Sequence, residues 1–320
     1  MKNTKIRLIT DTAIGAALCS LLLIITMYVP FIRVFGVLVC GTPFMYLACK
    51  RGVVSTITAL LIALITVTIL TGNLLTSILL TLSYVIPGFA FSIAVSKKMS
   101  TSALVLITSG AVLLGFLIEL VIMSGDGIRN FMNEMMLQMS QIVEDTLSSL
   151  TEGAPENLPS LINKMLSESV EIFMRFLPAV FIITAFGYGY ITSAFGAYFL
   201  KRMQICDIKF RKFYEIRAPK FISNMIFIFY IVSLIGDSRS TFIMAIDNIV
   251  LVSAAILGFC GLSVIDYYFK RKIEAGVARF VIYIAGFVLL SAIMPFAVTL
   301  LPMVGYIDSK GIMRRELEEK

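Results

Sequence analysis

Long apolar runs, separated by short polar connections, fill most of the chain. An α-helix needs about 20 consecutive apolar residues to cross a hydrocarbon core of roughly 30 Å, and the runs reach that length repeatedly. Windows of about 19 residues place the expected spans at 8–29, 31–49, 52–71, 74–96, 102–124, 172–200, 221–236, 246–269 and 279–302. The pattern therefore predicts an all-α protein, a polytopic transmembrane helical bundle with about eight to nine spans.

The spacing of these runs divides the chain into five parts. A bundle of five spans, a polar insertion, a sixth span, a basic connection and a second group of spans follow one another at 1–124, 125–171, 172–200, 201–220 and 221–320. In the last group Pro295 and Pro302 interrupt the final apolar run. We therefore leave open whether this run crosses once or re-enters as two half-spans.

The composition agrees with a membrane protein and argues against other classes. Apolar residues make up 58% of the chain and charged residues 15%, whereas soluble domains have roughly 25% charged residues. The first apolar run is long and lacks the cleavage site of a signal peptide, which predicts a retained helix. The five cysteines show no CxxC spacing, so neither a disulfide framework nor a metal site is expected.

Basic residues gather in every second connection between the spans. Because Lys and Arg stay on the cytoplasmic side, this alternation predicts a multi-pass plasma-membrane protein with a cytoplasmic N-terminus. The insertion 125–171 carries eight acidic residues and two basic ones, which fits an external position. Topology thus accounts for the net charge of +7, and we expect the lipid bilayer, not nucleic acid, as a partner.

Within the external insertion, apolar residues recur every three or four positions between Ile128 and Leu150. This spacing predicts an amphipathic helix, and a helical pattern resumes after Pro159 and continues into the sixth span. Two interpretations remain open. The helices lie on the outer membrane surface or cap the bundle, or they form a methionine-rich lid over a ligand cavity.

Small residues at helical spacing indicate where membrane helices approach each other closely. Ala13 and Ala17 form an Ala-x-x-x-Ala pair in the first span, a longer stripe covers 185–197 in the sixth, and Ala254 with Gly258 repeats the spacing in the eighth. The pair in the first span is a candidate docking face for a partner helix. The alternative for each stripe is packing inside the bundle.

Charged side chains inside apolar runs are costly, at about 2.5 to 3.5 kcal/mol near a helix centre on insertion scales. Arg33, Glu119 and Arg175 are expected at similar depth near the outer face, so that Glu119 and Arg175 can form an ion pair. Tyr84 lies beside a kink predicted at Pro87, and transporters place binding groups at such breaks. These four residues form a candidate ligand-binding site. One alternative is that the long charged side chains simply extend to the membrane interface. The other is that the kink at Pro87 binds no ligand.

Residues for catalysis are scarce. The chain contains no histidine, which excludes histidine-based triads and histidine zinc sites. The glycine-rich loops that bind phosphate are also missing from the sequence. We expect Asp11, Asp247 and Asp266, which lie near span ends, to face water or cap helices. The sequence therefore predicts a protein that is not an enzyme and has no cofactor.

The first 100 residues resemble the substrate-binding (S) subunits of energy-coupling factor transporters. The resemblance rests on the small-residue first helix, a short outer turn, and "VCGTPFMYLACKRGVVSTITALLIAL" with its Lys50–Arg51–Gly52 turn. Over its whole length, including "FRKFYEIRAPKF", the chain is similar to the YybS-like family of bacterial membrane proteins. The first resemblance implies that Ala13 and Ala17 contact a transmembrane coupling protein and that ligand enters from outside.

The leading hypothesis is binding or uptake of a small solute by Arg33, Tyr84, Glu119 and Arg175, with ATPase subunits supplied by a partner complex. The rival hypothesis is a non-transporting scaffold of the cell envelope, held through the small-residue faces and the basic connection 201–220. The alternative explanation for the basic charge of this connection is attraction to anionic lipid. A lipid-modifying enzyme comes third, because the chain lacks histidine.

Overall fold

The computed structural model describes residues 2–124, 130, 134, 137–138, 141–142, 158–206, 208–237, 240–273, 278–279, 281 and 294–314. Every regular element within these ranges is helical, which confirms the all-α prediction. The chain divides into two compact units. Unit 1 comprises Met1–Phe173 and Thr184–Phe210, and unit 2 comprises Met174–Ile183 and Arg211–Lys320. Each unit is described by itself.

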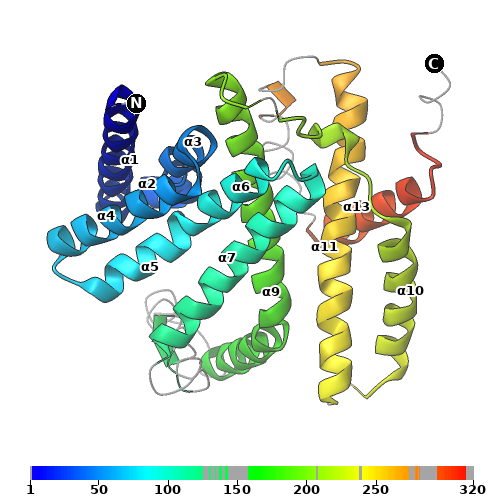
Figure 1. Cartoon of the computed structure of the whole chain (residues 1–320). Coiled ribbons are helices and arrows are strands. Elements are labelled where there is room, and N and C mark those ends of the chain that lie inside the picture. The colour runs from blue at the N-terminus through cyan, green and yellow to red at the C-terminus, as the bar shows by residue number, and fades with distance from the viewer. Residues whose placement is uncertain are drawn as a thin grey trace. The chain divides into compact units, whose positions relative to one another are not determined.

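Unit 1 contains seven helices from the first part of the chain, together with part of a long later helix (Figure 1). They are α1 (Lys2–Tyr28), α2 (Pro30–Val39), α3 (Thr42–Arg51), α4 (Val53–Thr71), α5 (Leu74–Tyr84), α6 (Ile86–Ser96), α7 (Thr101–Met123) and α9 (Leu158–Arg202). Local sequence sets several ends. The side chains of Asn73 and Ser100 accept hydrogen bonds from the first-turn amides of α5 and α7, as expected of N-cap residues.

Two of the expected spans are broken at neighbouring places. The run 31–49 is interrupted between α2 and α3 at Cys40 and Gly41, and the run 74–96 bends by 43° at Val85, between α5 and α6. Gly88 explains why the breaks coincide: a Cβ atom on it would lie 2.7 Å from the Cα atom of Gly41. Two backbones therefore meet here, and the kink predicted at Pro87 is confirmed.

The core of unit 1 joins α1, α3 and α4. Cys19 and Leu23 of α1 pack with Phe44 of α3 and with Ala59 and Ala63 of α4, all buried. A second cluster links α3 and α6 to the later part of α9. Small side chains on α4 let the apolar residues of α1 and α3 interdigitate, which holds the broken helices in place.

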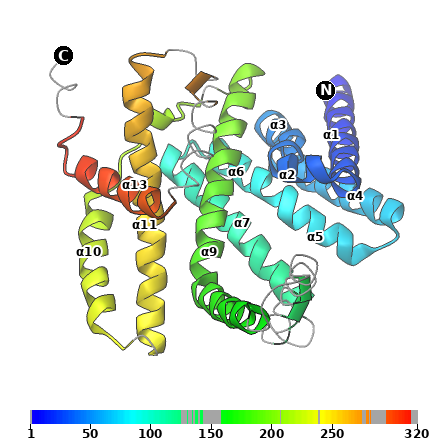
Figure 2. The same ribbon diagram turned by 180° about the vertical axis from the view of Figure 1, so that it is seen from behind.

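Unit 2 is built from helices late in the chain (Figure 2). It contains η1 (Phe213–Glu215), α10 (Lys220–Ile235), α11 (Thr241–Lys270) and α13 (Met294–Ser309), and α10 lies beside α11. Helices α11 and α13 cross closely, because a Cβ atom on Gly261 would overlap the carbonyl oxygen of Leu301. The sequence indicated Ala254 and Gly258 as the small face of α11. A Cβ atom on Gly258 would lie 3.7 Å from Pro302, an ordinary contact, so the close backbone approach is made at Gly261 and not at Gly258.

Among the described residues, five helices are long and apolar enough to cross a membrane, and a sixth crossing results if α5 and α6 count as one bent span. Within the described residues the number of candidate spans is therefore lower than the predicted eight to nine. Helices α2 and α3 are short because of the break between them. Helix α10 has 16 residues, or about 24 Å at 1.5 Å per residue, less than a hydrocarbon core of roughly 30 Å.

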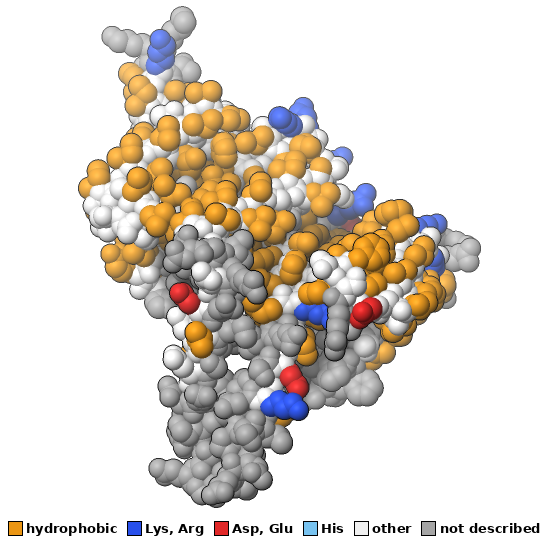
Figure 3. Space-filling view, turned by 90° about the horizontal axis from the view of Figure 1, so that it is seen from below, with side chains coloured by type: hydrophobic (Ala, Val, Ile, Leu, Met, Phe, Trp, Pro, Cys, Tyr) orange, Lys and Arg blue, Asp and Glu red, His pale blue; other side chains and the backbone are white. Residues whose placement is uncertain are grey.

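The surface of the described residues fits a lipid environment. Figure 3 shows one face of the molecule, where hydrophobic side chains cover much of the described part and few charged groups lie among them. Exposed examples on membrane-length helices include Leu61 of α4 and Leu106 of α7. In water such a surface would be unfavourable, whereas hydrocarbon chains cover it at no such cost.

The external insertion is described only in part. Most of the predicted amphipathic helix lies outside the described residues, as does 282–293 in the last expected span. Helix α9 begins at Leu158 and continues through Pro178 to Arg202. This confirms that the helical pattern after Pro159 runs into the sixth span, while the choice between a surface helix and a lid stays open.

Candidate functional site

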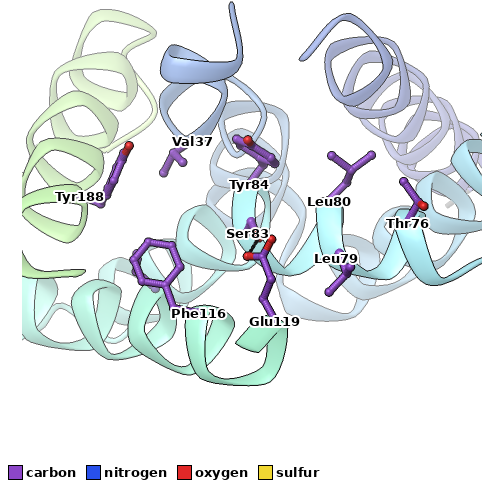
Figure 4. A pocket seen from close by; sticks show the side chains of 10 residues that line it. Val37, Thr76, Leu79, Leu80, Ser83, Tyr84, Phe116, Glu119 and Tyr188 are labelled. Atoms are coloured by element: carbon purple, nitrogen blue, oxygen red, sulfur yellow. Dashed lines mark hydrogen bonds between the residues drawn. The ribbon is translucent and has the colours of Figure 1, made fainter. Parts of the chain in front are cut away.

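Unit 1 contains a cavity of about 290 Å³ bordered by α2, α5, α7 and α9 (Figure 4). Its volume lies near the lower end of small-molecule sites in proteins. Most of the wall is apolar or aromatic, with a few polar groups. The lining residues are Val37, Thr76, Leu79, Leu80, Ser83, Tyr84, Val112, Phe116, Glu119 and Tyr188.

One carboxylate gives this cavity its charge. Glu119, near the end of α7, accepts a hydrogen bond from the Ser83 hydroxyl on α5, with the two oxygens 3.0 Å apart. Figure 4 shows both side chains turned toward each other at the cavity wall. No Lys or Arg belongs to the described lining. Within those residues the field in the cavity is therefore set by a negative group.

The break between α5 and α6 supplies a further acceptor. Pro87 has no N–H group, so the carbonyl of Ser83, four residues earlier, lacks its usual helical donor. Ser83 and Tyr84 are the last residues before the break at Val85. The hydroxyl of Ser83 and the phenol of Tyr84, two residues that line the cavity, therefore lie directly beside the interruption.

Aromatic rings form another part of the wall. The rings of Phe116 and Tyr188 pack edge to face, with centroids 6.3 Å apart and planes at 82°. Phe116 lies three residues before Glu119 on α7, so both occupy the same helix face. The carboxylate and the aromatic pair therefore border one space.

The structure brings together two of the four predicted ligand-binding residues. Tyr84 and Glu119 both line the cavity. Arg33 lies in α2, but its side chain is outside the described residues. Arg175 belongs to unit 2 and pairs with Asp247, not with Glu119 as we expected from their depth. The ligand-binding role of these residues stays a prediction.

Arg175 is part of a polar cluster that we call the Asp247 clamp, formed by Arg175, Ser233, Asp247 and Asn248. Asp247 of α11 accepts hydrogen bonds from Arg175 of α9 and from Ser233 of α10, one on each carboxylate oxygen. Its side chain is only 13% exposed and faces protein groups. The prediction that Asp247 faces water is therefore wrong. The clamp joins three helices of unit 2.

Asn248 completes the clamp at a weak point of α9. Its amide accepts a hydrogen bond from the N–H of Ala179 at 2.9 Å and donates to the carbonyl of Arg175 at 3.0 Å. In a regular helix these two backbone groups bond each other. Pro178 disturbs the helix here, and Asn248 satisfies both groups from the neighbouring helix. A polar Asp-Asn pair in an apolar run was the available sequence signal.

A second polar cluster surrounds Arg314, which the sequence analysis did not single out. Its guanidinium donates to the carbonyls of Tyr214 and Ile216 and lies 3.1 Å from the Asp308 carboxylate. Burial raises the pKa of the Asp308 carboxyl, and the nearby positive charge of Arg314 opposes this. Arg314 is 3% exposed, so its hydrogen-bonding groups serve the fold.

The small-residue stripes differ in what they contact. Ala13 and Ala17 are exposed on α1, while Ala16 between them is buried. On α9 the stripe is internal, since a Cβ atom on Gly189 would lie 2.6 Å from the Cα atom of Ser109. Packing inside the unit therefore explains the α9 stripe. A partner for Ala13 and Ala17 stays a prediction.

Metal binding finds no support in the described part of the chain, where no group of three or more His, Cys, Asp or Glu residues lies close enough to hold an ion. The five cysteines are free thiols.

Comparison with known proteins places the chain at the level of a family. No curated protein and no solved structure matches it. Residues 17–309 match the family described as "Predicted membrane protein (DUF2232)". That description names neither the YybS-like family nor the transporter subunits, so both resemblances stay predictions, as does the orientation in the membrane. Because the match covers most of its length, this multi-pass membrane protein belongs to the DUF2232 family.

Proposed function

We propose that this protein binds a small solute in the cavity of unit 1 and takes part in its uptake, without catalysing a reaction. The observation that carries the proposal is the cavity itself, where an apolar and aromatic wall surrounds one carboxylate and several hydroxyl groups. Binding sites for small molecules combine an apolar wall with a few orienting polar groups in this way.

Two further features support binding. An ionisable side chain within a membrane helix is a candidate functional group because its burial is costly, and Glu119 lies in the membrane-length helix α7. The broken helix pair α5 and α6 borders the same cavity. Interrupted helices in transporters expose backbone groups to their substrates.

ATP-driven uptake would require a partner that supplies the ATPase, because the sequence has no phosphate-binding loop. The exposed residues Ala13 and Ala17 on α1 offer a face that another helix can approach closely. In this proposal a coupling protein docks there and brings ATPase subunits. The scaffold alternative uses the same face without a solute.

Blocking the cavity tests solute binding. The purified full-length protein is screened in detergent for small solutes that raise its melting temperature, beside a Val112→Trp variant. Val112 is buried in the cavity wall, whereas Val121 on the same helix is 62% exposed, so Val121→Trp is the matched control. We expect the stabilising solutes to act on wild type and on Val121→Trp and to lose their effect on Val112→Trp.

The milder Leu79→Phe variant repeats the test if Val112→Trp does not fold. Stabilisation that is unchanged in the folded cavity variant would contradict binding in this cavity.

A second experiment tests the partner. Affinity purification from native membranes compares wild type with an Ala13→Leu, Ala17→Leu variant, and an Ile14→Leu, Leu18→Ile variant serves as the control because it alters exposed neighbours without adding volume. Co-purification of a coupling protein and ATPases that is lost only with the bulky leucines supports uptake. Recovery of envelope proteins instead would favour the scaffold.

A further inference from the structure

We infer that the cavity of unit 1 selects a small organic cation, with an amine or quaternary ammonium group held by Glu119 and the surrounding aromatic rings. This inference rests on the proposed function and adds the chemical class of the solute. Three observations support it: the charge of the cavity, its aromatic rings, and its excess of hydrogen-bond acceptors over donors.

Charge is the first argument. Glu119 accepts its described hydrogen bond from the neutral Ser83 hydroxyl. No Lys or Arg of the described side chains forms an ion pair with it. A half-buried carboxylate beside an apolar wall is stabilised by a positive partner and repels an anion. A cationic solute supplies that partner.

Aromatic groups are the second argument. Phe116 and Tyr188 border the same space as the carboxylate, and Tyr84 adds a third ring. The face of an aromatic ring attracts a cation within about 6 Å, and sites for quaternary ammonium groups are typically built from such rings. A neutral solute of the same shape would gain only the apolar contact.

Hydrogen-bond balance is the third argument. When ionised, Glu119 can only accept hydrogen bonds, and the Ser83 carbonyl lacks its helical donor because of Pro87. The hydroxyls of Thr76 and Tyr188 can also accept hydrogen bonds. The lining thus offers more acceptors than donors, which suits an ammonium group with its several N–H donors.

Two other charge clusters among the described residues do not offer comparable sites. In the Asp247 clamp both carboxylate oxygens are engaged by protein groups. Arg314 likewise donates to two backbone carbonyls and faces Asp308. Glu119 differs because open volume adjoins it.

Matched probes test the charge requirement. Equilibrium binding to the full-length protein in detergent is measured for choline, for its neutral isostere 3,3-dimethylbutan-1-ol, for butylammonium and for butyrate. We expect at least one cation to bind, and to bind at least tenfold more tightly than the neutral alcohol or butyrate. Glu119→Gln should weaken cation binding at least tenfold, whereas Glu215→Gln, in η1 of unit 2, leaves it unchanged.

A second variant addresses the rings. Phe116→Leu keeps an apolar wall but removes one aromatic face, so cation binding should weaken several-fold while any binding of the alcohol stays the same. This variant also keeps the inference testable if Glu119→Gln does not fold.

The outcomes separate this inference from the proposed function. If butyrate or the alcohol binds as tightly as the cations and Val112→Trp abolishes that binding, the cavity binds solutes but the cation inference is wrong. If both cations fail to bind while other solutes depend on Val112, the inference is likewise overturned and solute binding stands. If no solute depends on Val112, the proposed function itself fails.

Discussion

The cavity of unit 1 and the Asp247 clamp of unit 2 both place a carboxylate among apolar helices, but they use it differently. In the clamp, each oxygen of Asp247 accepts a hydrogen bond from another helix. In the cavity, one oxygen of Glu119 accepts from Ser83 and the side chain borders open volume. A carboxylate whose oxygens are engaged by the protein serves the fold, whereas one that adjoins a cavity can serve a ligand.

The two regions also treat a proline differently. At Pro178 the neighbouring helix supplies Asn248, which bonds the two backbone groups beside the disturbance. At Pro87 the chain bends by 43° and the end of α5 borders the cavity. A helix interruption is thus repaired in one region and left beside a potential ligand in the other.

The largest effect on stability should come from Asp247→Ala. This change leaves Arg175, whose side chain is 27% exposed, without its anionic partner, and removing one member of a buried pair costs about 3 kcal/mol. Thermal or denaturant unfolding in detergent measures the loss. The double variant Arg175→Met, Asp247→Leu should lose less than the single variant. A double variant as unstable as Asp247→Ala would show that charge compensation is not what the clamp provides.

Asn248→Leu should have the next largest effect. Leucine has a similar size but leaves the N–H of Ala179 and the carbonyl of Arg175 without the amide, at about 2 kcal/mol. Unfolding measurements, combined with hydrogen exchange at Ala179, test this. Unchanged protection of that amide would mean that α9 closes its own hydrogen bond when Asn248 is absent.

Gly189→Ala probes the packing next to Tyr188 in the cavity wall. Its Cβ atom would lie 2.6 Å from the backbone of Ser109, whereas a Cβ atom on Gly187 meets nothing within 4 Å. We expect Gly189→Ala to destabilise by about 1 to 2 kcal/mol and Gly187→Ala to be neutral or stabilising through helix propensity. Equal melting temperatures for the two variants would contradict a rigid α7–α9 contact at the cavity.

The smallest effect on stability should come from Glu119→Gln. Glutamine keeps an acceptor for Ser83, and no described ion pair is lost, so unfolding should change by less than about 0.5 kcal/mol. We expect the large effect of this substitution on cation binding instead. A loss of stability as large as that of Asp247→Ala would show that Glu119 stabilises the fold as Asp247 does. The contrast between the two regions would then be wrong.

Part of the candidate site was predictable because it depends on local chemistry. Pro87 interrupts a helix wherever it stands inside one, and Tyr84 and Glu119 were visible as polar groups in apolar runs. The partner of Arg175 was not predictable, because Asp247 lies 72 positions away in sequence. From their similar depth in the membrane we expected Arg175 to pair with Glu119. The packing of α9 against α11 instead brings Arg175 to Asp247.

The number of spans and the tight glycine contacts were also beyond the sequence pattern. Apolar length marks 31–49 as a crossing, yet the meeting of Gly41 with Gly88 accompanies its division into α2 and α3. Small-residue spacing marked Ala254 and Gly258, but a Cβ atom on Gly258 would make only ordinary contact with Pro302, whereas one on Gly261 would overlap the backbone of Leu301 in α13. Such spacing shows that a helix can be approached, not which turn is used.

By itself the sequence determined the helical class, the membrane character and the break at Pro87, because apolar periodicity, run length and the missing proline N–H act locally. Only the tertiary structure decided which carboxylate is engaged and which borders a cavity, and which small residues are buried. Those properties depend on contacts between distant helices, and a chain's local pattern leaves many such pairings equally possible.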